Sequence, residues 1–263
     1  MDINVHISNP DYFFDLLNYG QISGIYIEQE RTTPERLRRF VKTAHEAGKM
    51  LYVALPFVWN TSAGKTLDRQ ISAIIGAFPD GYLIRNIDEL GLLSDRNASG
   101  KKILDEGMYT WNHFAMTELS ALGADIFTAP YELSLKELED RWLSYTEIVA
   151  YGNYPLMVSN NCFRKTTGKC VKEKDEYGIY RLKDRKNASF PVVNCCRYCY
   201  NIIYNSVPTW LLDEEGIQRA PYIRLSFTTE SRLEMKNILD RYFAGDTAPR
   251  VSMTRGHFRK GAE

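Results

Sequence analysis

Short runs rich in Val, Ile, Tyr and Leu recur along this chain, and each is followed by a longer segment whose apolar residues have helical spacing. Alternation of strands and helices is typical of a parallel β-sheet. Eight strands are predicted, at residues 3–8, 24–28, 50–55, 81–85, 103–110, 125–128, 147–151 and 222–227. Because barrels of roughly 250 residues fold as single units, the 263 residues predict a TIM-like (β/α)8 barrel of the α/β class.

The segments between these strands are predicted to be helices. Segment 34–47 has its apolar residues on one face, begins with Pro34 and is followed by Gly48, which suit the first turn and the cap of a helix. The same spacing predicts helices at residues 11–18, 67–77, 87–93, 113–122, 135–142 and 229–243.

The connection between the last two predicted strands is far longer than the others. We expect residues 152–219 to form a Cys-rich insertion with a hairpin (177–182 and 189–193), and residues 1–151 and 220–244 to form the barrel. Loops that follow barrel strands build the functional face, so the insertion is expected over the barrel mouth. Residues 245–263 are expected to form an irregular tail. Since the sequence begins inside a strand, we also expect it to be part of a longer polypeptide.

All five cysteines lie in the predicted insertion. Cys196 and Cys199 have the Cys-x-x-Cys spacing of metal ligands, and Cys162 and Cys170 would complete four thiolates. Cys195 is left over, because adjacent residues rarely bind one centre. Four thiolates suit a structural zinc ion or an iron-sulfur cluster, and the spacing does not separate the two. A redox dithiol and inert buried thiols remain alternatives.

The insertion is also basic, although the whole chain has a net charge of zero. Between Cys162 and Tyr200 there are ten Lys or Arg and four acidic residues. Such a surface attracts phosphate, and interleaved tyrosines can stack on unpaired bases. The alternative is that the hairpin binds no nucleic acid, is exposed to solvent, and carries positive charges that balance the negative charges of the thiolates. The candidate RNA-binding or anion-binding residues are Lys165, Lys169, Lys183, Arg185 and Arg197.

Polar residues near the predicted strand ends are candidates for substrate contact, because active sites of such barrels lie at this end. They are Glu28, Arg85, Asn86, Asn112, His113, Glu147, Tyr151 and Arg224. The two arginines could hold a carboxylate or phosphate with paired hydrogen bonds, and Asn112 could read a base edge or a carbonyl. Ion pairs within the mouth and hydrogen bonds that hold loops are the alternative roles.

Four segments of the sequence resemble the peptidase U32 family, the collagenase-like proteases. They are residues 147–162 (EIVAYGNYPLMVSNNC), 180–185, 196–206 and 254–258. The resemblance implies a barrel domain that is often found in longer chains. It also implies a protease label without settled catalytic residues, and relatives that are iron-sulfur proteins for oxygen-independent hydroxylation of transfer RNA, ribosomal RNA or quinone, with prephenate as an oxygen source.

The cysteines match the family pattern only in part. Cys162, Cys170 and Cys199 match by position, whereas the family cysteine that closely follows the second one has no counterpart at residues 171–174. Cys196 would have to replace it. No His-Glu-x-x-His or Gly-x-Ser-x-Gly motif is present, so a protease activity has no local signature and no catalytic residue is assigned.

We therefore expect a cytoplasmic iron-sulfur enzyme, with a 4Fe-4S cluster, that modifies RNA. The alternatives are a collagenase-like peptidase acting on a peptide or protein, and a non-catalytic module in which zinc holds an RNA-binding or protein-binding surface. Prephenate is a co-substrate by resemblance alone. A membrane partner is not expected, because no apolar run approaches the ~18 residues of a spanning helix.

The ligand assignment predicts the outcome of single Cys-to-Ser substitutions. After anaerobic purification, serine at position 162, 170, 196 or 199 is expected to abolish metal binding, measured as iron, zinc and sulfide per chain. Cys195→Ser is the matched control and is expected to keep the metal. Full metal content in Cys196→Ser together with loss in Cys195→Ser would overturn the assignment.

Overall fold

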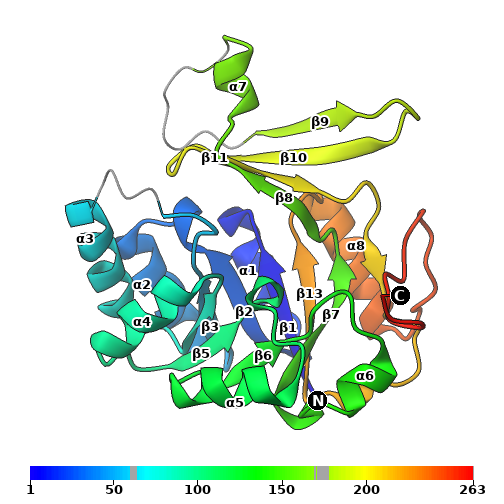
Figure 1. Ribbon diagram of the computed structural model, residues 1–263, viewed down its shortest axis with the longest axis horizontal. Coiled ribbons are helices and arrows are strands. Elements are labelled where there is room, and N and C mark those ends of the chain that lie inside the picture. Colours follow the sequence, from blue (N-terminus) through cyan, green and yellow to red (C-terminus); the bar gives the residue numbers. More distant parts are fainter. Residues whose placement is uncertain (60–63, 169, 171–177, 263) are drawn as a thin grey trace.

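The computed structural model describes residues 1–59, 64–168, 170 and 178–262, and they contain a closed barrel of eight parallel strands (Figure 1). Each strand pairs with the next in the chain, and the last one pairs with both the seventh and the first. The strands are β1 (Asp2–Ile7), β2 (Ile22–Glu28), β3 (Met50–Ala54), β4 (Gly81–Ile84), β5 (Lys101–Leu104), β6 (Ile126–Thr128), β7 (Thr146–Gly152) and β13 (Tyr222–Phe227). The predicted (β/α)8 barrel is confirmed.

Helices connect the barrel strands and cover the outside of the barrel (Figure 1). In the predicted helix that begins at Pro34, the Thr33 side chain accepts a hydrogen bond from the Arg36 amide, and the apolar face is buried. The last helix begins with a reciprocal capping box between Ser231 and Glu234. The helices are α1 (Phe13–Leu16), α2 (Pro34–Glu46), α3 (Gly64–Ile75), α4 (Ile87–Asp95), α5 (His113–Ala121), α6 (Leu135–Glu139) and α8 (Arg232–Phe243).

The fifth strand is much shorter than predicted. It ends at Leu104, and a 3-10 helix follows at Glu106–Met108, so the prediction of a strand through residue 110 was wrong. The Asp105 side chain accepts a hydrogen bond from the Glu106 amide, and the turn ends at Tyr109 with a left-handed backbone (φ 49°). This turn brings two adjacent acidic residues to the end of the barrel.

A second sheet lies between β7 and β13 in the sequence and is antiparallel, with the strand order β8-β11-β10-β9. Its strands are β8 (Pro155–Ser159), β9 (Ile179–Lys183), β10 (Ser189–Cys195) and β11 (Tyr200–Tyr204). The predicted hairpin is confirmed in β9 and β10, apart from residue 177, which lies outside the described residues. Figure 1 shows this sheet beyond the carboxyl ends of the barrel strands, with α7 (Phe163–Thr166) farther out.

One face of the second sheet packs on the barrel. Tyr200, Ile202 and Tyr204 alternate along β11 and are buried, as are Val193 and Cys195 on the neighbouring strand. These side chains form a cluster with Phe57, Val58 and Trp59 from the loop that follows β3. Burial of a large apolar side chain contributes about 1.5–3 kcal/mol, so this face holds the sheet firmly against the barrel.

The barrel itself has two apolar regions, because successive side chains of a strand point to opposite faces. Tyr26, Tyr52, Leu83, Ile103 and Ile126 form a buried cluster separate from the large one. The large cluster joins the opposite faces of the strands to the surrounding helices. The separate cluster fills part of the barrel interior.

The chain end folds back on the barrel. Thr254 forms a bridge with Thr209 in β12 (Thr209–Trp210), a strand that pairs with β7. The Arg255 guanidinium is paired with Asp213, and the Leu135 amide donates to the Phe258 carbonyl. In the part of the chain that is described, no helix has the length and apolarity needed to cross a membrane.

Gly152 ends β7 at a close approach to β13. Its φ is 140°, and a Cβ at this position would lie 2.5 Å from the Ser226 carbonyl oxygen. We expect Gly152→Ala to lower the free energy of unfolding by about 2–4 kcal/mol, since both the backbone and the neighbouring strand would be strained. Urea denaturation measures the loss.

Gly20→Ala is the matched control for this substitution, because a Cβ at Gly20 would have no neighbour within 4 Å. It is expected to change stability by less than about 1 kcal/mol. Equal stabilities of the two variants would contradict the role of Gly152.

Candidate active site at the barrel mouth

Buried polar side chains meet at the carboxyl end of the barrel. His6 in β1, Glu28 in β2, Asp105 after β5 and Arg224 in β13 are each 4% exposed or less, and the Arg85 side chain after β4 is also 4% exposed. Five different strands supply these residues, because parallel strands present their carboxyl ends at one end of a barrel. We name this group the mouth network.

Arg85 connects two acidic residues of the mouth network. Its Nη1 and Nη2 each donate to a Glu28 oxygen at 2.9 Å, and its Nε donates to Asp105 Oδ2 at 3.0 Å. The guanidinium also bonds the Leu55 carbonyl and lies 4.0 Å from the ring centre of Phe57. Although burial opposes ionisation, Arg85 and then His6 hold the pKa of the Glu28 carboxyl below its usual range. Arg85 is therefore occupied by protein groups.

Arg224 has spare hydrogen-bonding capacity. Its Nη2 donates to Asp105 Oδ1 at 2.6 Å, and its Nε lies 3.5 Å from Glu147 Oε2. The buried Nη1 has no hydrogen-bond partner. An unpaired buried donor is costly, so this atom marks a position where a bound group would be stabilised.

Asp105 and Glu106 are adjacent acids with opposite pKa shifts. Burial and the Asp105 charge raise the pKa of Glu106 well above its usual range. Burial works against ionisation of Asp105 as well, but the Arg224 guanidinium outweighs it and lowers the pKa of that carboxyl. The pair thus favours one ionised and one protonated carboxyl, the combination used for acid–base catalysis.

The second sheet closes the mouth. Pro155 and Tyr204 from this sheet, together with Glu106, Arg224 and Tyr131, line a cavity of about 20 Å³. A cavity of this size holds about one water molecule. In this arrangement, a water or one small polar group of a substrate fits between the acids and the arginines.

The other predicted substrate residues lie away from the mouth cavity. Glu147 is fully buried inside the barrel, where it accepts hydrogen bonds from Asn4 (2.8 Å) and Tyr26 (2.9 Å). Tyr151 belongs to the large apolar cluster between the barrel strands and the surrounding helices. Asn112 and His113 are exposed at the start of α5, where the Asn112 side chain caps the helix.

Cys195 links the second sheet to the barrel. Its thiol donates to Glu30 Oε1 at 2.9 Å, and the Tyr200 hydroxyl donates to Glu30 Oε2 at 2.6 Å. Burial and the nearby Glu30 charge raise the pKa of this thiol well above its usual range. A protonated, hydrogen-bonded thiol is a packing group, which agrees with leaving Cys195 out of the ligand set.

The other four cysteines are all among the described residues. Asn201 Nδ2 donates to the Asn161 carbonyl at 3.2 Å and so ties the Cys162 segment to the hairpin end that carries Cys196 and Cys199. Cys170 is exposed. Over the described residues, no group of three or more His, Cys, Asp or Glu is arranged to hold a metal ion. We assign no step to a cluster.

The predicted anion-binding residues fall into two groups. Lys165, Lys183 and Arg185 are exposed. Arg197 instead faces the barrel, where its Nη1 donates to the carbonyls of Gln29 (3.4 Å) and Thr32 (3.3 Å). Lys169 lies outside the described residues.

Asp105 and Glu106 were not predicted as site residues, because the fifth strand was predicted to extend through them. The signal was the sequence Asp-Glu-Gly directly after Ile103 and Leu104, since acidic residues and glycine favour turns over strands. His6 lies in β1, and its Nε2 is 2.9 Å from Glu28 Oε1.

The fold is similar to that of a solved U32 peptidase, Mk0906. The two share 11% sequence identity with a TM-score of 0.53, over 88% of this chain and 94% of that one. The C-terminal domain of a chitinase-like protein from Desulfitobacterium hafniense DCB-2 is 7% identical, with a TM-score of 0.46 over 94% of this chain and 99% of that domain. No protein-family model and no curated protein matches the chain. The similarity to the U32 peptidase is one of fold.

The raised pKa of Glu106 predicts a pH dependence of stability. This pKa is higher in the folded chain than the value of 4.5 for a free Glu side chain, so ionisation favours unfolding. Its stabilising contribution is complete below about pH 4.5 and is lost as the pH rises toward the folded value, by up to about 1.4 kcal/mol per pH unit. Urea denaturation between pH 5 and 8 should show this decline, and Glu106→Gln should reduce it.

Glu89 adds a decline of the same sign, because burial raises its pKa to about 8. The difference between wild type and Glu106→Gln therefore isolates Glu106. The control is Glu118→Gln on the exposed face of α5, which should leave the slope unchanged. Identical slopes in wild type and Glu106→Gln would contradict the assignment.

Proposed function

We propose that this chain is an enzyme of U32-like fold whose mouth network, together with Glu106, performs acid–base chemistry on RNA. The observation that carries the enzymatic part is the pair of adjacent carboxyls with opposite pKa shifts, Asp105 and Glu106, beside the cavity. Opposite shifts at neighbouring acids are a feature of acid–base sites.

In this proposal each residue of the mouth has one role. Glu106 holds and releases a proton at its carboxyl, and Asp105 remains ionised beside Arg224. Arg224 Nη1 donates to the polar group that enters the cavity. Arg85 positions Asp105 through its Nε and binds Glu28 with its other nitrogens.

The choice of RNA is supported by the hairpin of β9 and β10. Arg181, Lys183, Arg185 and Lys186 are exposed at its end, and Asp184 is the single acid among residues 181–186. The Asp184 side chain accepts hydrogen bonds from the amides of residues 186 and 188, which shapes the loop. An exposed cationic hairpin on the sheet that covers the mouth suits a phosphate backbone.

Peptide hydrolysis is the second candidate. The specific observation in its favour is that the mouth cavity of about 20 Å³ has room for one water beside Glu106 and Asp105. A water held between a proton donor and an acceptor is the arrangement that hydrolysis requires. The name of the solved U32 peptidase points to the same activity.

The redox part of the hypothesis, an iron-sulfur cluster for oxygen-independent hydroxylation of RNA, remains a prediction. Its support is the sequence resemblance and the hydrogen bond between Asn201 and Asn161 that joins two of the cysteine-bearing segments. A visible spectrum after anaerobic purification distinguishes a cluster from zinc, because only the cluster absorbs visible light. Zinc would favour the non-catalytic module.

RNA binding tests the proposed function directly. In a triple variant, Lys183→Gln, Arg185→Gln and Lys186→Gln, affinity for single-stranded RNA should fall about tenfold or more, and the slope of log K against log salt should decrease by about 2. The matched control removes the same charge from α2 (Arg38→Gln, Arg39→Gln, Lys42→Gln) and should bind like wild type. Fluorescence anisotropy measures both.

Glu106→Gln separates binding from chemistry. It should bind RNA like wild type and lose RNA modification, detected by mass spectrometry of cellular RNA. Equal RNA affinities for wild type and the hairpin variant would contradict the choice of RNA. Hydrolysis of denatured casein by wild type, lost in Glu106→Gln, would establish the second candidate instead.

A further inference from the structure

The second sheet has one face that points away from the barrel. Successive side chains of a strand point to opposite faces, and the buried Val193, Tyr200 and Ile202 define the face on the barrel side. The side chains between them belong to the opposite face. Figure 1 shows α7 on that side of the sheet, farther from the barrel. We name this surface the outer face.

An apolar row crosses the outer face over all four strands. In the register of the sheet, Tyr180 in β9 lies opposite Val192 in β10, and Val192 lies opposite Ile203 in β11. Ile203 in turn lies opposite Met157 in β8. The outer face is therefore apolar across its full width, from one edge strand to the other.

Two aromatic rings lie next to each other on the outer face. Phe190 lies opposite Leu182, one position along the face from the pair of Tyr180 and Val192. Tyr180 and Phe190 are thus diagonal neighbours, and aromatic side chains can reach each other at this spacing of about 7–8 Å. Both rings are partly exposed, and Leu182 beside them is 45% exposed. Exposed aromatic rings are surfaces on which flat ring systems stack.

The ring of Tyr180 is held in place by its neighbours. Phe163 in α7 meets it edge-on, with ring centres 4.6 Å apart. Gly178 leaves room for it, because a Cβ at this position would lie 2.6 Å from Tyr180 Cε2. A ring that is already ordered loses little conformational freedom when a ligand binds, which favours binding.

The surroundings of the outer face are strongly cationic. Over the described residues of α7 and the second sheet (155–168, 170 and 178–204), Asp184 is the one acid. The exposed cations of the same segments are Lys165, Arg181, Lys183, Arg185 and Lys186. An apolar, aromatic surface with cations around it matches a polyanion that also presents flat rings, and single-stranded nucleic acid is such a polyanion.

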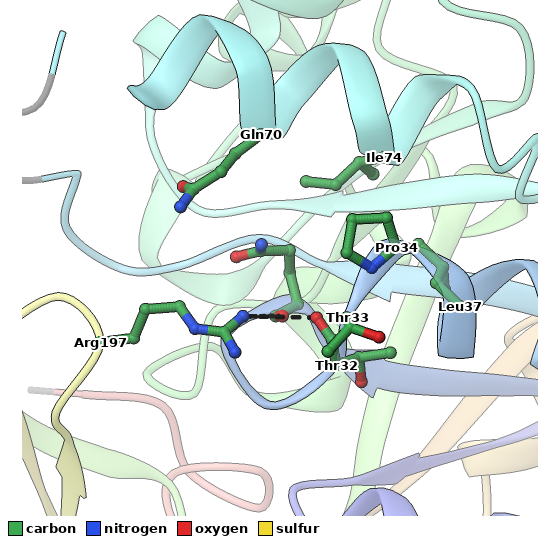
Figure 2. A pocket seen from close by; sticks show the side chains of 8 residues that line it. Thr32, Thr33, Pro34, Leu37, Gln70, Ile74 and Arg197 are labelled. Atoms are coloured by element: carbon green, nitrogen blue, oxygen red, sulfur yellow. Dashed lines mark hydrogen bonds between the residues drawn. The ribbon is translucent and has the colours of Figure 1, made fainter. Parts of the chain in front are cut away.

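Arg197 belongs to the other side of the sheet. Figure 2 shows its guanidinium directed at the loop that precedes α2, where Nη1 donates to the carbonyls of Gln29 and Thr32. Tyr198 and Tyr200 are also buried on the barrel side. The candidate stacking residues are therefore Tyr180 and Phe190.

We propose that the outer face binds unpaired nucleotides, whose bases stack on Tyr180 and Phe190 and whose phosphates pair with the cations of α7 and the β9–β10 hairpin. This inference rests on the proposed function and names the part of the RNA that the chain recognises. In a duplex both faces of each base are covered by neighbouring base pairs, so only the ends are free to stack. The chain therefore binds single strands in preference to duplexes.

The test compares three RNA probes by fluorescence anisotropy. They are a single strand of about twelve nucleotides, the same strand paired with its complement, and a strand of equal length whose central bases are replaced by abasic sites. The abasic strand keeps the phosphates and lacks the rings. Wild type should bind the single strand about tenfold more tightly than either of the other probes, because only the single strand offers stacking bases.

Substitutions at the two rings locate the binding. Tyr180→Ala and Phe190→Ala should each weaken binding of the single strand about tenfold and leave the affinity for the abasic strand unchanged. The slope of log K against log salt should stay as in wild type, because no charge is removed. Tyr180→Phe keeps the ring and should bind like wild type. The matched control is Tyr145→Ala, since Tyr145 is 54% exposed and lies before the first residue of β7, at the amino end of the barrel.

Far-ultraviolet circular dichroism and a thermal transition establish that each variant is folded. Should Tyr180→Ala not fold, Phe190→Ala and the comparison of the three probes on wild type still decide the question. Equal affinities for the single strand and the abasic strand, or unchanged binding in both alanine variants, would overturn the outer face as the site and leave the proposed RNA chemistry standing.

Two further results have a different meaning. No binding of any RNA probe by wild type would overturn the proposed function and this inference together. Binding of oligoglutamate by wild type, lost in Tyr180→Ala and without any binding of RNA, would overturn the nucleotide assignment and identify the outer face as a docking site for an acidic protein segment.

Discussion

Two buried arginines pair with carboxylates at the barrel mouth, and these ion pairs restrict where the barrel strands can lie. Arg85 bridges Glu28 and Asp105, and Arg224 holds the other oxygen of Asp105. Leaving one buried charge unpaired costs about 3–5 kcal/mol. The strands β2, β4, β5 and β13 must therefore keep the positions that bring these groups together, and the barrel closes around them.

The same ion pairs explain why Asp105 and Glu106 favour different protonation states. Asp105 has both arginines as partners, so it favours the ionised form, while Glu106 is buried beside that negative charge and favours the protonated form. The second sheet adds to the effect, because Tyr204 and Pro155 cover the cavity and limit access of water. The ion pairs of Asp105 and the cover provided by the second sheet therefore act together to keep Asp105 ionised and Glu106 protonated.

The second sheet is joined to the barrel by apolar packing and by specific polar contacts. Cys195 and Tyr200 donate to the two oxygens of Glu30, and Tyr198 reaches Gln29 in the same loop. The last residue of β2, Glu28, belongs to the mouth network, and the two residues that follow it, Gln29 and Glu30, hold the second sheet.

The eight strands, most of the helices and the β9–β10 hairpin could be predicted from the sequence, because the spacing of apolar residues is a local property that persists in the fold. The sequence also predicted that Arg85 and Arg224 lie near the carboxyl ends of strands. The placement of Glu147 and Tyr151 away from the mouth cavity, and of Asp105 and Glu106 beside it, is a property of the folded chain. Those positions depend on where a strand stops and which way its last side chains point, and packing between distant segments sets both.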